Sequence, residues 1–353
     1  MSGTNFSISA TESDFCFQPL TCATSKGHLV VWGTGIDANQ SVWVRSFIGR
    51  KASCAIKIST INEKDNIIFF RRFHRELCVL AIETNDGYKL YFLNDNGDVC
   101  DSQIYTTKDI LVHCYQNNQD TIIFVYNHDN NTMSVQTVFV DKSWDNAQTT
   151  HHYDNVYGIP HVFIFEDDNY TAGWITCDDK LTVVSNCVYS KDIATETIVA
   201  SYDIDYLIAA CLCPDLVVYG GYYTRNKVLR LDYFRVSDLK LVCSRYWKSD
   251  EYKDMSFSMA SLNRGFMLLA DGPSPTQACG QRFTHLGSWL YPMMSFDSSD
   301  IPTWSPDLAQ GNEETLLVYI KYHEDYSEVW GKWLDIGIIP ELENLTLADV
   351  EAQ

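Results

Sequence analysis

Carboxylate side chains recur in the short polar stretches that separate apolar runs along the chain. These stretches are GIDANQ (35–40), TNDG (84–87), NHDNN (127–131), CDDK (177–180), YTRNK (223–227), DGPSPTQ (271–277) and HEDYSE (323–328). All but the fifth carry acids, and the candidate residues among them are Asp37, Asp86, Asp129, Asp178, Asp179, Asp271, Glu324 and Asp325. Carboxylates could bind calcium or recruit a basic protein segment. Because Asn, Asp and Gly are also the usual residues of hairpin turns, turn formation alone accounts for most of these positions.

A second group of titratable residues is centred on two adjacent histidines. Its members are His151, His152, His161, Glu166, Asp167 and Asp168. A metal-dependent hydrolase uses such side chains, but His161 lies in an apolar run and the histidine pair in a polar one, so we expect no convergence. The chain also lacks GxSxG, GxGxxG and Walker patterns. We therefore predict no catalytic residue and no resident metal, and expect a protein that is not an enzyme.

Aromatic residues form a third set of candidates. They make up 13% of the chain, which has nine tryptophans. Most lie in alternating runs, where packing is the ordinary role. Trp247, Trp289 and Trp304 lie in turns or less apolar stretches, and we expect them to be exposed to a sugar or a protein partner.

Composition restricts the kind of partner. The net charge of -20 opposes binding to nucleic acid, whose affinity for proteins comes mainly from Lys and Arg, whereas a basic protein surface would be complementary. The first residues have no basic segment followed by an apolar one, and no run has the ~18 apolar residues that a membrane helix needs. The twelve cysteines include no CxxC pair. These features predict a reduced, cytoplasmic or otherwise intracellular protein without membrane insertion.

The polar stretches belong to a repeat. Seven pairs of apolar runs, such as GHLVVWGT (27–34) with SVWVRSFIG (41–49), have cores that begin at Leu29, Cys78, Ile122, Thr171, Leu216, Phe266 and Leu316. Their mean spacing is about 48 residues. A third run precedes many of the pairs, as in NIIFFRRFH (66–74), and a more polar run follows, as in CDSQIYTT (100–107). Four strands per repeat predict an all-β, seven-bladed β-propeller of four-stranded blades. The alternative is a two-domain β-sandwich protein.

The two ends of the chain are expected to close the ring. The seventh repeat has no fourth strand after Gly337, whereas NFSISAT (5–11) alternates like a strand and precedes the first inner strand. We predict that residues 1–15 supply the closing strand of the last blade. Residues 1–337 then form one propeller domain, and 338–353 form an acidic C-terminal tail.

The segments GHLVVWGTGIDANQSVWVRSFIG (27–49) and RGFMLLADGPSPTQACGQRFTHLG (264–287) follow the pattern G-x-ϕ-V-x-W, then ϕ-x-ϕ-x-x-F and a glycine turn. This pattern resembles the propeller-type repeats of bacterial surface and calcium-associated repeat proteins. The resemblance implies the architecture and makes bound calcium an option. The WD-repeat signature does not hold, because no Trp-Asp pair ends a strand at the repeat spacing.

A non-enzymatic propeller scaffold or structural subunit, which mediates protein–protein interaction in a larger assembly, is the function that these features favour. The alternative is a carbohydrate-binding or carbohydrate-processing propeller that uses exposed aromatics and loop carboxylates. A calcium-stabilised surface protein is a third option.

Overall fold

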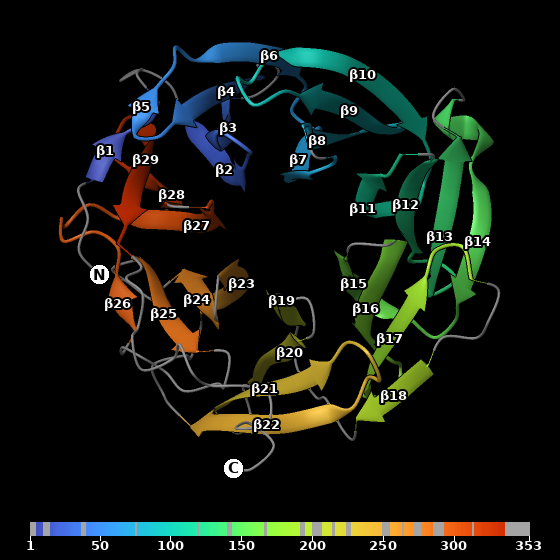
Figure 1. Ribbon diagram of the computed structural model, residues 1–353. Coiled ribbons are helices and arrows are strands. Elements are labelled where there is room, and N and C mark those ends of the chain that lie inside the picture. The colour runs from blue at the N-terminus through green and yellow to red at the C-terminus, as the bar shows by residue number, and fades with distance from the viewer. Residues whose placement is uncertain are drawn as a thin grey trace.

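Seven antiparallel sheets form a closed ring (Figure 1). Their innermost strands line a central channel. The structure is a computed structural model that describes residues 5–9, 15–36, 40–74, 76–118, 120–139, 143–165, 168–190, 195–199, 207–213, 216–223, 227–248, 255–262, 265–271, 277–284, 293–312 and 314–335. The prediction of a seven-bladed propeller is confirmed. The acidic tail predicted for 338–353 lies outside the described residues.

The first three blades follow one another along the chain. Their strands are β2 (Cys16–Ala23), β3 (Gly27–Thr34), β4 (Gln40–Ile48), β5 (Lys51–Ala52) and β6 (Ile56–Ile61) in blade one; β7 (Asn66–Arg72), β8 (Cys78–Thr84), β9 (Gly87–Leu93) and β10 (Val99–Thr106) in blade two; and β11 (Ile110–Gln116), β12 (Asp120–Asn127), β13 (Thr132–Phe139) and β14 (Gln148–Tyr153) in blade three. A 3-10 helix, η1 (Trp144–Asn146), precedes β14.

The remaining four blades repeat the same order. Their strands are β15 (Tyr157–Ile164), β16 (Asn169–Ile175), β17 (Leu181–Cys187) and β18 (Thr195–Val199) in blade four; β19 (Ile208–Cys213), β20 (Leu216–Tyr223), β21 (Val228–Arg235) and β22 (Leu241–Lys248) in blade five; β23 (Ser256–Leu262), β24 (Gly265–Asp271), β25 (Ala278–Thr284) and β26 (Met294–Ser295) in blade six; and β27 (Thr303–Gln310), β28 (Thr315–Tyr322), β29 (Ser327–Leu334) and β1 (Asn5–Ser7) in blade seven.

Burial changes with the position of a strand in its blade. The second strands lie between neighbouring blades, so both of their faces are covered, and in β12 and β28 every residue but the last is buried. The outer strand β10 is mostly exposed. The apolar second runs and the polar fourth runs of the sequence repeat follow from this difference, because only a strand covered on both faces can bury consecutive apolar residues.

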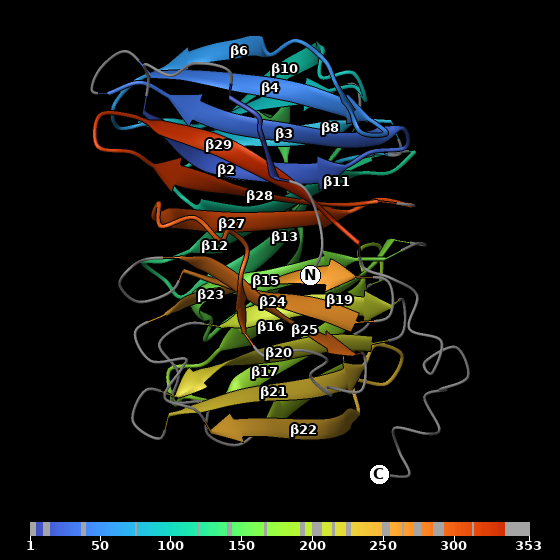
Figure 2. The same cartoon turned by 90° about the vertical axis from the view of Figure 1, so that its left-hand side faces the viewer.

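The hydrophobic core is divided among the contacts between blades. One cluster joins blades one and seven through Val30, Trp32, Leu316 and Val318, all of them buried. Similar clusters join the other neighbouring blades. The side view shows the blades as tilted, stacked sheets (Figure 2). Each blade therefore depends on both of its neighbours for the burial of its apolar faces.

The N-terminal strand closes the ring, as the sequence predicts. β1 pairs with β29 in antiparallel register, with Phe6 opposite Gly331. Ile8 and Ser9 follow β1 and are buried, and the Ser9 hydroxyl accepts a 2.9 Å hydrogen bond from the Val329 amide. The ring-closing blade thus combines the first and last strands of the described chain.

Within the described residues, no helix is long and apolar enough to cross a membrane.

Candidate functional site

The turns between the second and third strands of all blades emerge on one face of the ring, because every blade repeats the same strand order and direction. This turn face contains Asp86, Asp129, Asp178, Asp179, Glu324 and Asp325, and all six are exposed. Asp178 is paired with Lys180 at 2.6 Å, and this contact, with a hydrogen bond from Thr176, lowers the pKa of Asp178. Asp37 lies outside the described residues.

Asp271 is placed differently from the other predicted acids. It is the last residue of β24 and is partly buried, and one of its carboxylate oxygens accepts a 2.7 Å hydrogen bond from the Ser305 amide of blade seven. Burial raises the pKa of this carboxyl, although the hydrogen bond opposes the shift. Asp271 therefore joins blade six to blade seven.

The Ser305 contact brings Asp271 close to a pair of exposed aromatic side chains. Trp304 is 39% exposed, Tyr322 is 37% exposed, and their ring centroids lie 6.4 Å apart in an edge-to-face arrangement. Glu324 and Asp325 follow Tyr322 directly. We call Trp304, Tyr322, Asp271, Glu324 and Asp325 the blade-seven patch. All of these residues except Tyr322 were separate candidates from the sequence. Tyr322 was not a candidate, because it ends a strand of otherwise buried residues.

The other tryptophan candidates do not join this patch. Trp247, in β22, is partly buried and packs edge-to-face on Phe283 at 5.2 Å, so it contributes to the contact between blades five and six and is only partly open to solvent. Its neighbour Tyr246 is 59% exposed. Trp289 lies outside the described residues.

The histidine cluster is separated by the fold. His151 and His152 lie on the outer strand β14, whereas His161 lies on the innermost strand β15. The His151 ring bonds to the Ser190 carbonyl at 2.9 Å, and the His161 ring bonds to the Leu207 carbonyl at 2.8 Å. Of the acids, Asp168 binds the Asn117 amide, while Glu166 and Asp167 lie outside the described residues. No group of three metal-ligating side chains occurs in the described part of the chain.

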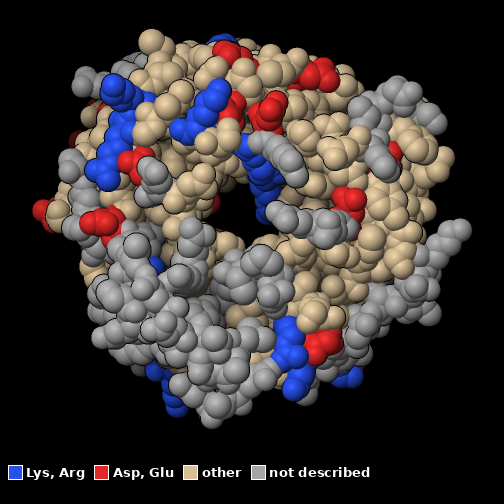
Figure 3. All heavy atoms as spheres, viewed as in Figure 1, with Lys and Arg blue, Asp and Glu red and all other residues tan. Residues whose placement is uncertain are grey.

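The central channel has a volume of about 1180 Å³. All seven innermost strands line it, and its wall combines apolar and aromatic side chains, such as Phe69, Phe163 and Phe257, with polar ones. No tryptophan lines it within the described residues. Figure 3 shows the opening from one side, with Lys or Arg atoms at its rim near the position of β7, the strand that contributes Arg71 and Arg72 to the wall.

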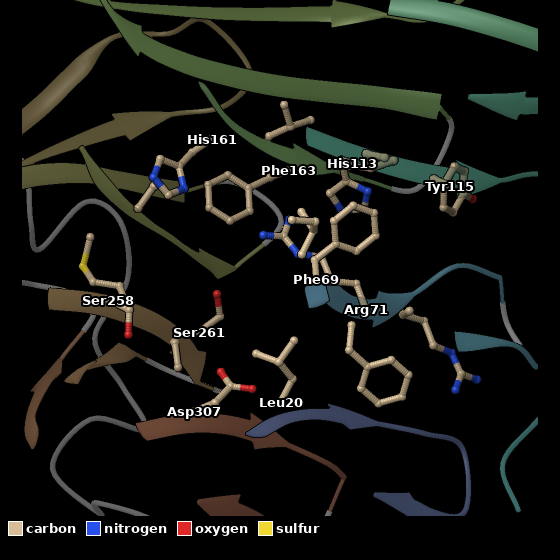
Figure 4. Close-up of a pocket in the computed structure, with 18 of the residues that line it drawn as sticks. Leu20, Phe69, Arg71, His113, Tyr115, His161, Phe163, Ser258, Ser261 and Asp307 are labelled. Atoms are coloured by element: carbon tan, nitrogen blue, oxygen red, sulfur yellow. The ribbon is translucent and has the colours of Figure 1, made fainter. Parts of the chain in front are cut away.

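Three titratable side chains lie at one level of the channel. His113 is opposite Phe124 in blade three, His161 is opposite Gly173 in blade four, and Asp307 is opposite Val318 in blade seven. The apolar cores of these second strands begin at Ile122, Thr171 and Leu316, and each partner lies two residues after that start. Equivalent positions in a closed ring face the same central space, and Figure 4 shows the three side chains around it.

Burial controls the charge of these three groups. Desolvation lowers the pKa of His113 to about 3, with the nearby Arg71 charge acting in the same direction, and lowers that of His161 to about 4. Both rings are therefore neutral at neutral pH. Burial raises the pKa of Asp307 to about 6, although the Thr21 amide donates a 2.7 Å hydrogen bond to its carboxylate.

Arg71 and Arg72 are adjacent on β7 but have different surroundings. Arg72 pairs with Asp95 at 3.4 Å. The guanidinium of Arg71 has no hydrogen bond and no ion pair to any described residue; it lies 5.7 Å from the ring of Phe69 and is open to the channel. Arg71 was not a candidate from the sequence, because two adjacent arginines in an apolar run carry no signal of their position in a ring.

Comparisons with known proteins support the fold. No protein-family model and no curated protein sequence matches the chain. A structure from a study of two prolyl endopeptidases superposes with a TM-score of 0.57 at 8% identity, over 92% of this chain and 51% of that one, so the chain spans about half of that protein. The β-propeller domain of Cps50 (Swd1) from Myceliophteria thermophila gives 0.57 at 10% identity, over 95% and 100%. Hsv2 from Kluyveromyces lactis gives 0.54 at 10% identity, over 90% and 98%.

At these identities the similarity establishes the fold alone, and the chain is a seven-bladed β-propeller.

Proposed function

We propose that this propeller is a non-enzymatic scaffold that binds a protein partner with a basic surface through the blade-seven patch. The observation that supports this most strongly is the exposed Trp304–Tyr322 pair beside Asp271, Glu324 and Asp325. Aromatic anchors surrounded by polar groups carry much of the energy of protein interfaces. The acids and the net charge of -20 favour a basic partner and speed its association.

The closed ring suits this role. The backbones that present Trp304 and Tyr322 belong to paired strands, β27 and β28, and the Asp271–Ser305 bond connects them to blade six. A rigid binding surface loses little conformational entropy on association. The two strands that carry the rings are thus fixed relative to each other before a partner binds.

The test is affinity purification of the tagged chain from its native source, with variants in the patch. The wild type is expected to retain a stoichiometric partner, and Trp304→Ala should weaken its retention at least about tenfold, as for an interface anchor. Tyr246→Ala is the matched control, because Tyr246 is also exposed but lies on the outer strand of blade five. Recovery of the wild type as a free monomer, or equal retention by both variants, would contradict the proposal.

A carbohydrate-processing propeller has less support. Paired carboxylates beside a tryptophan in the channel would support that function. The described channel wall has no tryptophan. Sugar binding at the Trp304–Tyr322 pair is distinguished by a glycan array, in which a saturable signal that Trp304→Ala abolishes would replace the protein partner. The calcium option stays a prediction, and it requires a melting temperature that rises with added calcium.

A further inference from the structure

Among the described residues, Arg71 is a channel cation that forms no direct ion pair. The Arg71 guanidinium lies inside the ring and has neither a hydrogen bond nor an ion pair to any described residue. Desolvation in the channel lowers the pKa of Arg71, and the charge of Asp307 opposes this shift. An arginine is nevertheless charged at any physiological pH. The Arg71 side chain is exposed to the space inside the channel, so its N–H groups are accessible to an oxyanion from solution.

The charges of Asp307 and Arg71 attract each other, which opposes the effect of desolvation on the pKa of each group, but the two side chains are not in direct contact. The two side chains face the same space (Figure 4), but they form no ion pair within 4.0 Å, and the Asp307 carboxylate is held in place by the Thr21 amide. The arrangement leaves room beside Arg71 for an anion from solution.

The walls around Arg71 suit the body of an organic ligand. Phe69 lies beneath the guanidinium, and Leu20 and Phe163 line the same space. The rings of His113 and His161 each donate to a main-chain carbonyl through one nitrogen, so in the neutral ring the other nitrogen is an acceptor, which does not bind an oxyanion. A charged group opposed by apolar walls and a few fixed polar atoms is the usual composition of a small-molecule site.

We propose that the channel binds a small organic oxyanion, a carboxylate or a phosphate ester with an apolar or aromatic body, through the guanidinium of Arg71. The oxyanion forms the paired hydrogen bonds that guanidinium groups make with carboxylate and phosphate, and its body packs against Phe69 and Phe163. This site is separate from the blade-seven patch and does not depend on the scaffold function.

The test is calorimetric titration of the full chain at constant ionic strength with benzoate, phenyl phosphate, acetate and inorganic phosphate. We expect saturable binding of benzoate or phenyl phosphate, and weaker binding of the two ions without a ring. Whichever of benzoate and phenyl phosphate binds more tightly shows whether the site prefers a carboxylate or a phosphate. The proposal would be overturned if none of the four probes binds the wild type. It would also be overturned if acetate and phosphate bind more tightly than benzoate and phenyl phosphate.

Variants locate the binding. Arg71→Met retains much of the apolar stem and should weaken affinity at least about tenfold. Arg50→Met is the matched control, since Arg50 is a surface arginine paired with Glu314, and it should bind like the wild type. Asp307→Asn removes a negative charge from the channel and should tighten binding at about pH 7.5, where the wild-type carboxylate is ionised. Equal affinity of Arg71→Met and wild type would exclude the site, and so would weaker binding by a folded Asp307→Asn variant.

Discussion

The main-chain amide of Thr21 donates a 2.7 Å hydrogen bond to a carboxylate oxygen of Asp307, a residue 286 positions away in sequence. The bond joins β2 of blade one to β27 of blade seven, which are neighbours only because the ring closes. The same carboxylate faces the channel with Arg71 and His161 (Figure 4). One side chain therefore links closure of the fold to the electrostatics of the channel.

Asp307 should make the stability of the protein depend on pH. Its folded-state pKa of about 6 lies above the ordinary 3.8, so the folded state holds this proton more tightly than the unfolded state does. Stability from this group is complete below about pH 4 and is lost as the pH rises to about 6, by at most about 3 kcal/mol. Asp307→Asn removes the titration, so its free energy of unfolding should rise relative to wild type between these pH values.

Other channel groups change the stability with pH in the opposite direction to Asp307. The effect of Asp307 is therefore measured as the difference between wild type and Asp307→Asn. His113 and His161 have lowered pKa values, and both stabilise the fold as the pH rises through the range between their folded values and 6.5. Arg71 keeps its charge throughout. Urea unfolding of wild type and Asp307→Asn at each pH isolates the carboxyl. A constant difference between the two curves from pH 4 to pH 6 would show that Asp307 is not perturbed.

Gly173 should not tolerate a side chain. A Cβ at this position would lie 2.3 Å from a ring carbon of Tyr219 in the next blade, and both residues are buried. Gly173→Ala is expected to lower stability by about 1–3 kcal/mol through overpacking. In the Tyr219→Ala background the same change should cost much less, because the ring has gone. Additive losses in this double-mutant cycle, measured by urea unfolding, would disprove the steric explanation.

Ile8 should be critical for ring closure although it lies near the N-terminus. Its side chain is buried between blades one and seven, in the cluster with Trp32 and Val318. Ile8→Ala should lower the free energy of unfolding by about 2–4 kcal/mol, the usual cost of a cavity in a core. The control is Ile104→Ala, on the outer strand β10, where the side chain is 68% exposed and the change should be within about 0.5 kcal/mol.

Deletion of residues 1–12 extends this experiment. It removes β1 and its pairing with β29, and the melting temperature should fall sharply because the outer edge of blade seven loses its partner. An unchanged melting temperature would show that the ring does not need its closing strand.

Much of the fold could be predicted from the chain because each blade uses local rules. The alternation of apolar second runs with polar fourth runs located β8 and β10, and the spacing of Leu29, Cys78 and their equivalents gave the number of blades. The missing fourth strand after Gly337 indicated closure by residues near Phe6.

The sites were less accessible to such reasoning. Trp304 and Asp271 were selected separately, but their proximity depends on the Asp271–Ser305 bond between two blades. Trp247 was expected to be exposed, yet Phe283 of the next blade covers part of it. Which tryptophan is exposed depends on how the blades pack against each other. The polarity of neighbouring residues in the sequence does not indicate that packing.

The sequence by itself determined the repeat, the strand order within a blade and the acidic charge of the turn face, because periodicity and composition are properties of neighbouring residues. Only the tertiary structure decided that Arg71, His113, His161 and Asp307 share one channel. These four residues come from four blades, and their convergence, with the desolvation that shifts their pKa values, exists only when the ring is closed.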